Sequence, residues 1–121
     1  MNRILVVDDE PDLRFLLRRI FERAGYEVVD AGDGAAAMAS VRAARPHLVV
    51  TDMMMPVMGG AELISRMRAD PATARIPILA ATGDAQLAGG ADAVLIKPYR
   101  PAELLAAGTE LMAQRALLPR A

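Results

Sequence analysis

Short apolar runs recur along this chain, separated by longer segments in which apolar residues return every three or four positions. Short runs bounded by charged or turn-forming residues are typical of buried strands, and the longer spacing is typical of one face of a helix. In the first longer segment, apolar residues stand at i, i+3, i+4, i+7 and i+8 from Leu13. The predicted strands are residues 3–7, Glu27–Asp30, His47–Thr51, Ile76–Ala81 and Ala93–Ile96.

Proline and glycine mark the ends of the predicted helices. Pro11 suits the first turn of a helix, and Gly25 is a natural stop at its carboxyl end. The turn at 32–34 precedes an alanine-rich helix at Ala35–Ala44. A third helix carries Leu63, Ile64 and Met67 and ends at Asp70-Pro71, and a last one begins at Pro101 and carries Leu104, Leu105, Leu111 and Met112.

The alternation of strands and helices predicts an α/β fold, a doubly wound parallel sheet with helices on both faces. The chain has 121 residues, the size of one domain. We expect a single domain over 1–121 with a core of about 3–116, and fraying at 117–121.

The amino-acid composition excludes several classes of function and site. Aromatic residues make up 3% against 54% hydrophobic residues, so the core must be aliphatic. The net charge of −1 gives no basic excess that would favour nucleic acid or an acidic membrane surface. There are no cysteines, which excludes disulfides and thiolate sites. No signal peptide or membrane-length apolar run is seen, so we expect a cytoplasmic protein.

Acidic residues close two of the predicted strands. Asp8 and Asp9 follow the first, and Asp52 follows the third. Because ligands of open α/β sheets collect at the carboxyl ends of the strands, these side chains are expected to meet. Gathered carboxylates repel each other, and a hard cation such as Mg²⁺ relieves that repulsion. A metal beside a carboxylate suggests phosphate chemistry.

Two further residues fall on the same edge of the sheet. Thr82 follows the fourth predicted strand and offers a hydroxyl, and Lys97 follows the fifth and offers a positive charge. With Asp52 as a nucleophile, this set supplies the positioning and charge neutralisation that phosphoryl transfer needs. Each residue alone has a structural explanation: Asp9 or Asp12 as a helix cap, Asp52 as a cap of its loop, Thr82 as a strand residue, Lys97 as a solvated side chain.

Four motifs lie on these strand ends in a fixed order: Val6-Val7-Asp8-Asp9-Glu10, Asp52-Met53-Met54-Met55-Pro56-Val57-Met58-Gly59-Gly60, Ala81-Thr82-Gly83 and Lys97-Pro98-Tyr99. Together they closely resemble the receiver domain of two-component response regulators, in particular single-domain, chemotaxis-regulator-like members. The resemblance covers nearly the whole chain. It implies a flavodoxin-like five-stranded parallel sheet in the order 2-1-3-4-5.

The resemblance also implies a function. Asp52 would accept a phosphoryl group from a phosphohistidine on a sensor histidine kinase or a histidine phosphotransfer protein. Asp8, Asp9, Asp52 and the backbone carbonyl of Met54 would hold Mg²⁺. Lys97 and Thr82 would contact the phosphoryl group, and Lys97-Pro98 would form a cis peptide bond.

Such a domain is a phosphoacceptor that promotes its own phosphorylation and dephosphorylation, and is not an enzyme in the usual sense. Gly83 would leave the phosphoryl site open, and Met54 and Asp84 match positions that influence the hydrolysis rate. The resemblance further implies signalling by contact with a downstream protein of unknown identity. A phosphorylation-dependent homodimer is a second form of output that it allows. No direct contact with nucleic acid or membrane is expected.

The chain departs from the family pattern at two places. Val94 stands where the family commonly carries an aromatic residue, three positions before the site lysine. The segment between Thr82 and Lys97 is about two helical turns shorter than usual and carries several glycines, which cost about 1 kcal/mol each in a helix. We therefore expect the fourth helix to be reduced to a turn or poorly ordered.

Three other functions stay open at this stage. One is a small Mg²⁺-dependent phosphatase with an aspartyl nucleophile, although Asp8 and Asp9 are adjacent where such enzymes separate the two acids by one residue. Another is a flavodoxin-type binding module, which needs a phosphate-cradling loop where Asp8-Asp9-Glu10 stands. The third is a receiver-like interaction module that is never phosphorylated.

Overall fold

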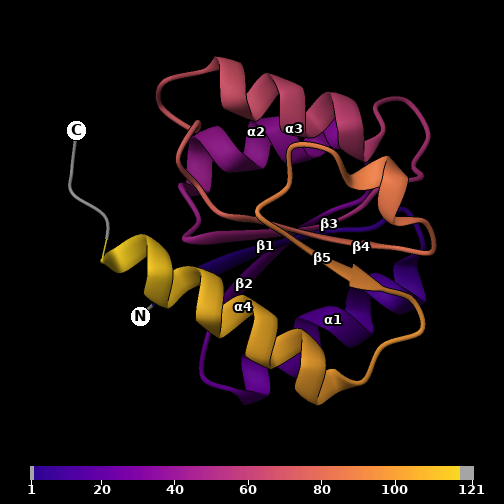
Figure 1. Ribbon diagram of the computed structural model, residues 1–121, viewed down its shortest axis with the longest axis vertical. Coiled ribbons are helices and arrows are strands. Elements are labelled where there is room, and N and C mark those ends of the chain that lie inside the picture. The colour runs from indigo at the N-terminus through magenta and orange to yellow at the C-terminus, as the bar shows by residue number, and fades with distance from the viewer. Residues whose placement is uncertain (1, 118–121) are drawn as a thin grey trace.

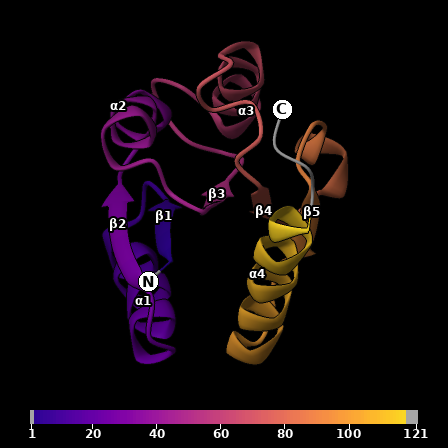
Figure 2. The ribbon, with the colours of Figure 1, turned by 90° about the vertical axis from the view of Figure 1, so that its left-hand side faces the viewer.

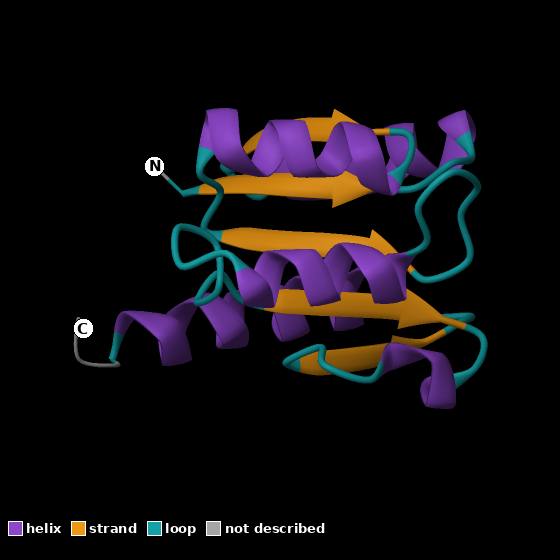
Figure 3. Ribbon diagram, turned by 90° about the horizontal axis from the view of Figure 1, so that it is seen from above, coloured by secondary structure: helices purple, strands orange, loops and turns teal. Residues whose placement is uncertain are grey.

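A five-stranded parallel sheet forms the centre of the computed structural model, which describes residues 2–117 (Figure 1). The strand order is β2-β1-β3-β4-β5, which confirms the predicted flavodoxin-like topology. All five strands point the same way, so their carboxyl ends share one edge (Figure 3). The strands are β1 (Arg3–Val7), β2 (Glu27–Ala31), β3 (Leu48–Asp52), β4 (Ile78–Thr82) and β5 (Ala93–Ile96).

Helices cover both faces of the sheet, as Figures 1 and 2 show from two directions. Helices α1 and α4 lie against one face, and α2 and α3 lie against the other, together with the short 3-10 helix η1. The helices are α1 (Pro11–Arg23), α2 (Gly34–Ala44), α3 (Gly60–Ala69), η1 (Ala85–Ala88) and α4 (Pro101–Ala116). None of the helices within residues 2–117 combines the length and the hydropathy that a membrane crossing requires.

Alternate side chains of β1 pack into two separate hydrophobic cores, one on each face of the sheet. Leu5 and Val7 pack into the core under α2 and α3, while Ile4 and Val6 pack into the core under α1 and α4. Side chains alternate between the two faces of a strand, so a strand covered on both sides needs apolar residues throughout. This is why the run at 4–7 has no polar residue.

Some element boundaries differ from the prediction. Strand β4 begins at Ile78, not at Ile76, because Pro77 has no N–H for a strand ladder. Strand β3 begins at Leu48 and continues through Asp52, one residue further than expected. Helix α2 begins at Gly34 because the Asp33 carboxylate caps it, accepting a hydrogen bond from the Ala36 N–H at 2.8 Å.

The predicted shortening of the fourth helix is confirmed. Between β4 and β5 the chain forms only η1, whose cap is Asp84, with its side chain accepting a hydrogen bond from the Gln86 N–H at 2.9 Å. Strand β5 is consequently only partly covered, and Val94 and Ile96 are exposed. At the end of the chain, α4 stops at Ala116; residues 118–121 of the predicted frayed segment lie outside the described residues.

Two glycines let the loop after β3 pack tightly at the carboxyl edge of the sheet. A Cβ on Gly34 would lie 2.5 Å from the Met58 carbonyl oxygen, and one on Gly60 would lie 2.6 Å from the Asp52 carbonyl oxygen. The Gly34 N–H donates to the same Met58 oxygen at 3.1 Å. These close approaches fix the loop that follows Asp52 against the start of α2.

Candidate functional site

The sheet brings the predicted site residues to one edge. Asp8 directly follows β1, Asp52 ends β3, Thr82 ends β4 and Lys97 directly follows β5. The register pairs Val7 with Thr51 and Asp52 with Ala81, so these ends are level with one another. Buried, apolar strands therefore deliver polar residues to a common place.

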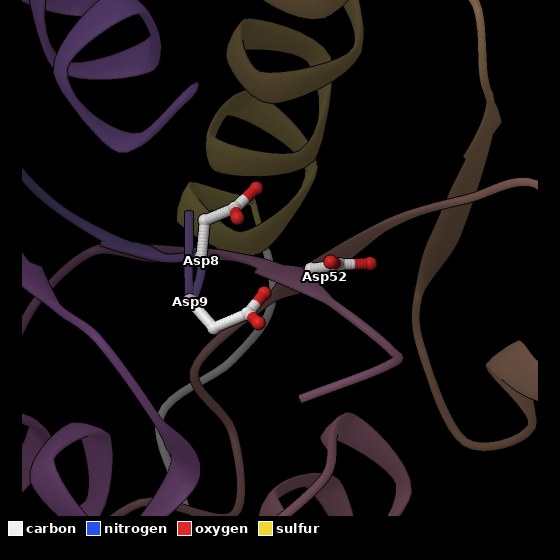
Figure 4. A group of neighbouring side chains, drawn as sticks. All are labelled: Asp8, Asp9 and Asp52. Carbon is white, nitrogen blue, oxygen red and sulfur yellow. The ribbon is translucent and has the colours of Figure 1, made fainter. Parts of the chain in front are cut away.

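Three carboxylates meet there. Asp8, Asp9 and Asp52 each offer one oxygen, and these oxygens all lie within 4.8 Å of one another. Figure 4 shows the three side chains together at the ends of β1 and β3. Asp8 is 2% exposed, Asp52 is partly exposed and Asp9 is exposed. The cluster thus reaches from the protein interior to solvent.

Asp8 is the most deeply buried of the three. Its carboxylate accepts a hydrogen bond from the Glu10 N–H at 2.9 Å. Burial raises the pKa of Asp8, and the negative charges of Asp52 and Asp9 raise it further; the Glu10 N–H and Lys97 act in the opposite direction. Negative charge is therefore costly at this position unless a cation compensates it.

Asp52 has a positively charged neighbour. Its Oδ1 lies 3.5 Å from Lys97 Nζ and accepts a hydrogen bond from the Met53 N–H at 2.7 Å. The Lys97 N–H donates to the Thr82 carbonyl at 2.9 Å, which ties the lysine to the end of β4. The peptide bond between Lys97 and Pro98 is cis, as predicted.

Thr82 is buried, and its hydroxyl is engaged locally. Its Oγ1 accepts a hydrogen bond from the Asp84 N–H at 3.2 Å and donates to the Asp84 carbonyl at 3.3 Å. A Cβ on Gly83 would meet nothing within 4 Å, so the space beside Thr82 is open. The side chain of Met54 is exposed on the loop after β3.

The structure excludes a helix-capping role for Asp9 and Asp12 but retains a local hydrogen bond for Asp52. Glu10 occupies the N-cap position of α1 and no side chain caps the helix, so neither Asp9 nor Asp12 serves that purpose. Asp52 does accept from the first N–H of its loop, in addition to facing Lys97.

Two nearby residues have no role assigned to them from the sequence. Arg14 reaches the Asp8 carbonyl from α1, with its Nη1 2.8 Å from that oxygen. Tyr99 is half-buried, and burial followed by the charges of Asp8 and Asp52 raises its pKa. The spacing of Arg14 gives no sign of its contact, whereas the Lys97-Pro98-Tyr99 motif places Tyr99 beside the site.

The donor set fits a hard divalent cation. The three clustered groups are all carboxylates, and oxygen ligands are those that Mg²⁺ prefers. Burial, together with the charges of Asp52 and Asp9, raises the pKa of Asp8, and a cation bound to the cluster would favour its ionised form.

The model for the response regulator receiver domain matches residues 4–109. The chain belongs to this family. The receiver domain is similar to the DNA-binding response regulator MtrA of Mycolicibacterium smegmatis, with 38% identity over 109 residues, which are 87% of this chain and 48% of that protein. The chain thus spans about half the length of the curated relatives it matches.

Solved receiver structures agree with the fold. The chemotaxis protein CheY4 of Vibrio cholerae superposes with a TM-score of 0.85 at 34% identity, covering 92% of this chain and 98% of that one. The response regulator TrrA of Thermotoga maritima, solved in complex with Mg²⁺-BeF, gives a TM-score of 0.84 at 30% identity, covering 92% and 99%. The resemblance inferred from the four motifs is therefore confirmed, and so is the assignment as a receiver domain of a two-component system.

Proposed function

We propose that Asp52 of this receiver domain accepts a phosphoryl group from a phosphohistidine donor and that the modified domain signals by protein contact. The observation that carries the proposal is the pairing of Asp52 with Lys97 at 3.5 Å inside a cluster of three carboxylates. The family membership supports the same chemistry. Family membership also favours this function over the phosphatase and the flavodoxin-type module.

In the transfer, an Asp52 carboxylate oxygen forms a bond to phosphorus as the phosphorus–nitrogen bond of the donor breaks. The imidazole nitrogen leaves with the electron pair and takes a proton from solvent, and Asp52 becomes an acyl phosphate. Lys97 lies where its ammonium can move from the carboxylate to a phosphoryl oxygen. The reaction needs mainly positioning and charge stabilisation, which these residues supply.

We propose that Asp8, Asp9, Asp52 and the backbone carbonyl of Met54 hold Mg²⁺. The clustering of the three carboxylates supports the first three ligands. For Met54 only the main chain is needed, which is consistent with its exposed side chain. Bound Mg²⁺ supplies positive charge that neutralises the phosphoryl oxygens. The protein groups hold the site in place: β1 and β3 carry the acids, and the Glu10 N–H fixes Asp8.

The signal would leave the site through Thr82. Its hydroxyl bonds Asp84, and Asp84 caps η1. A new phosphoryl oxygen would compete for the Thr82 hydroxyl and so loosen the start of η1, which packs against β5. Moving such an equilibrium from 1:99 to 99:1 takes about 5.5 kcal/mol. Position 94 carries valine and not an aromatic ring, and the element proposed to move is η1.

The proposed donor is a sensor histidine kinase or a histidine phosphotransfer protein. Phe15 and Leu16 of α1 are 61% and 53% exposed, which supports a protein docking surface on that helix. The proposed receiver of the signal is a protein, with a phosphorylation-dependent homodimer as one form of output. We propose a cytoplasmic phosphoacceptor, not a turnover enzyme, with no direct contact of residues 2–117 with nucleic acid or membrane.

Incubation with Mg²⁺ and acetyl phosphate tests the chemistry without a protein donor. Intact mass is expected to rise by one phosphoryl group in the wild type and not in Asp52→Asn, whose amide is a poor nucleophile of the same shape. Equal phosphorylation of both proteins would refute Asp52 as the acceptor. Sustained turnover of a generic phosphate ester would favour the phosphatase alternative.

A further inference from the structure

The main chain of Asp8 sits where the strand ladder ends. The Asp8 N–H donates to the Ala31 carbonyl at 3.2 Å, as the last contact with β2. The register between β1 and β2 ends at Val7 and Ala31, after which the chain turns into α2. The Asp8 carbonyl therefore lacks a partner from β2, and a buried carbonyl needs one from elsewhere.

Arg14 supplies that partner. Its Nη1 donates to the Asp8 carbonyl at 2.8 Å, from one turn inside α1. The side chain is partly buried, and within residues 2–117 it takes part in no ion pair. Arg14 thus donates a hydrogen bond to the main chain that carries Asp8 and Asp9, and it forms no ion pair with their carboxylates in the described residues.

Gly32 makes room for the arginine. A Cβ at Gly32 would lie 3.2 Å from Arg14 Nη1 and 3.8 Å from Cζ, so the guanidinium passes directly over this residue. The φ angle of Gly32 lies outside the left-handed region, so its backbone does not itself require glycine. A side chain at position 32 would therefore act mainly by displacing the guanidinium.

We propose that Arg14 is a positioning residue for Mg²⁺: by holding the Asp8 carbonyl, it sets the placement of the Asp8 and Asp9 carboxylates and hence the affinity for the cation. This inference rests on the proposed metal site. Groups that orient metal ligands without touching the metal change metal affinity by about 10- to 100-fold when they are removed. Because Arg14 acts through the main chain, the expected change is about tenfold, at the low end of that range.

The direction in which Mg²⁺ affinity changes when Arg14 is replaced distinguishes a positioning role from a purely electrostatic one. The positive charge of Arg14 repels a cation, so removal of the charge alone would tighten Mg²⁺ binding. Loss of positioning would weaken it. Arg23, on the same helix about two and a half turns away, is exposed and offers a matched control with the same change in net charge.

Isothermal titration with Mg²⁺ alone provides the test. Arg14→Met is expected to raise the Mg²⁺ dissociation constant about tenfold, Arg14→Lys by less because the ammonium still donates, and Arg23→Met not at all. Phosphorylation by acetyl phosphate is expected to recover in Arg14→Met at saturating Mg²⁺. Binding by Arg14→Met that equals or exceeds that of the wild type would overturn the inference.

Gly32→Ala tests the same contact without touching the arginine, which covers the case in which Arg14→Met does not fold. It is expected to weaken Mg²⁺ binding in the wild-type background and to have a smaller effect when combined with Arg14→Lys, in which part of the contact is already lost. Additive effects of Gly32→Ala and Arg14→Lys would contradict a shared cause. If the wild type itself binds no Mg²⁺, the proposed metal site fails and the positioning role fails with it.

Discussion

Replacing Asp8 by asparagine should stabilise the metal-free protein at neutral pH. Asparagine keeps the shape of the side chain and an oxygen that accepts the Glu10 N–H, but it removes one charge from the cluster. Burial and the charges of Asp52 and Asp9 raise the pKa of Asp8, so its ionised form costs stability in the folded state. The buried position of Asp8, which is 2% exposed, keeps water from screening this cost.

The size of the effect follows from the geometry. One carboxylate oxygen from each of the three residues lies within 4.8 Å of the other two. Two like charges at that distance repel by about 3 kcal/mol at an effective dielectric constant of 20. The attraction of Lys97 offsets part of this repulsion, which leaves about 1–2 kcal/mol. For a domain of this size that corresponds to about 4–8 °C in Tm.

The pH dependence has a definite sign. The folded protein holds the Asp8 proton more tightly than the unfolded chain does, so the free energy of unfolding falls as pH rises from the ordinary value of 3.8 through the raised pKa. The advantage of Asp8→Asn should be largest above the raised pKa of Asp8 and should shrink as pH is lowered toward 3.8. Mg²⁺ reverses the order, because at 100 times its dissociation constant it adds about 2.7 kcal/mol to the wild type alone.

Urea unfolding at several pH values, with and without Mg²⁺, measures these differences directly. The reasoning would be wrong if metal-free Asp8→Asn were no more stable than the wild type at pH 7. It would also be wrong if the advantage persisted at pH 3.8 or if Mg²⁺ stabilised both proteins equally.

Two further predictions concern the surface around the site. Val57 has φ 68° and is 84% exposed. Val57→Gly should therefore relieve about 1–2 kcal/mol of left-handed backbone strain, of which about 0.4–1 kcal/mol is lost to the greater entropy of the unfolded chain. The midpoint of urea unfolding should rise with unchanged slope, and a fall in the midpoint would contradict the strain. Phe15→Ala should slow phosphorylation by a histidine phosphodonor about tenfold, as loss of an aromatic contact does, yet leave the rate with acetyl phosphate unchanged. Equal slowing with both donors would place the effect of Phe15 in the chemistry, not in docking.

The parts of the fold that could be predicted are those set by local pattern. The run at 4–7 is apolar because both faces of β1 are covered, and the acids at positions 8, 9 and 52 stand out because they end such runs. Periodicity alone predicts a parallel sheet with helices on both faces; the strand order came from the resemblance of the motifs to a family. The shortened fourth helix follows from the glycines and the length of its segment.

What the sequence did not reveal depends on contacts across the fold. The bond from Arg14 to the Asp8 carbonyl joins a helix to the end of a strand, and an arginine on a charged helix face gives no sign of it. The role of Gly34 is likewise visible only once the Met58 carbonyl lies against it.

The most direct test of the central claim is a crystal structure of the protein grown with Mg²⁺ and beryllofluoride. The account predicts beryllium bonded to an Asp52 carboxylate oxygen, Mg²⁺ on the oxygens of Asp8 and Asp9, and Lys97 in contact with fluoride. A structure in which the fluoride complex avoids Asp52, or in which Mg²⁺ binds away from Asp8 and Asp9, would contradict it.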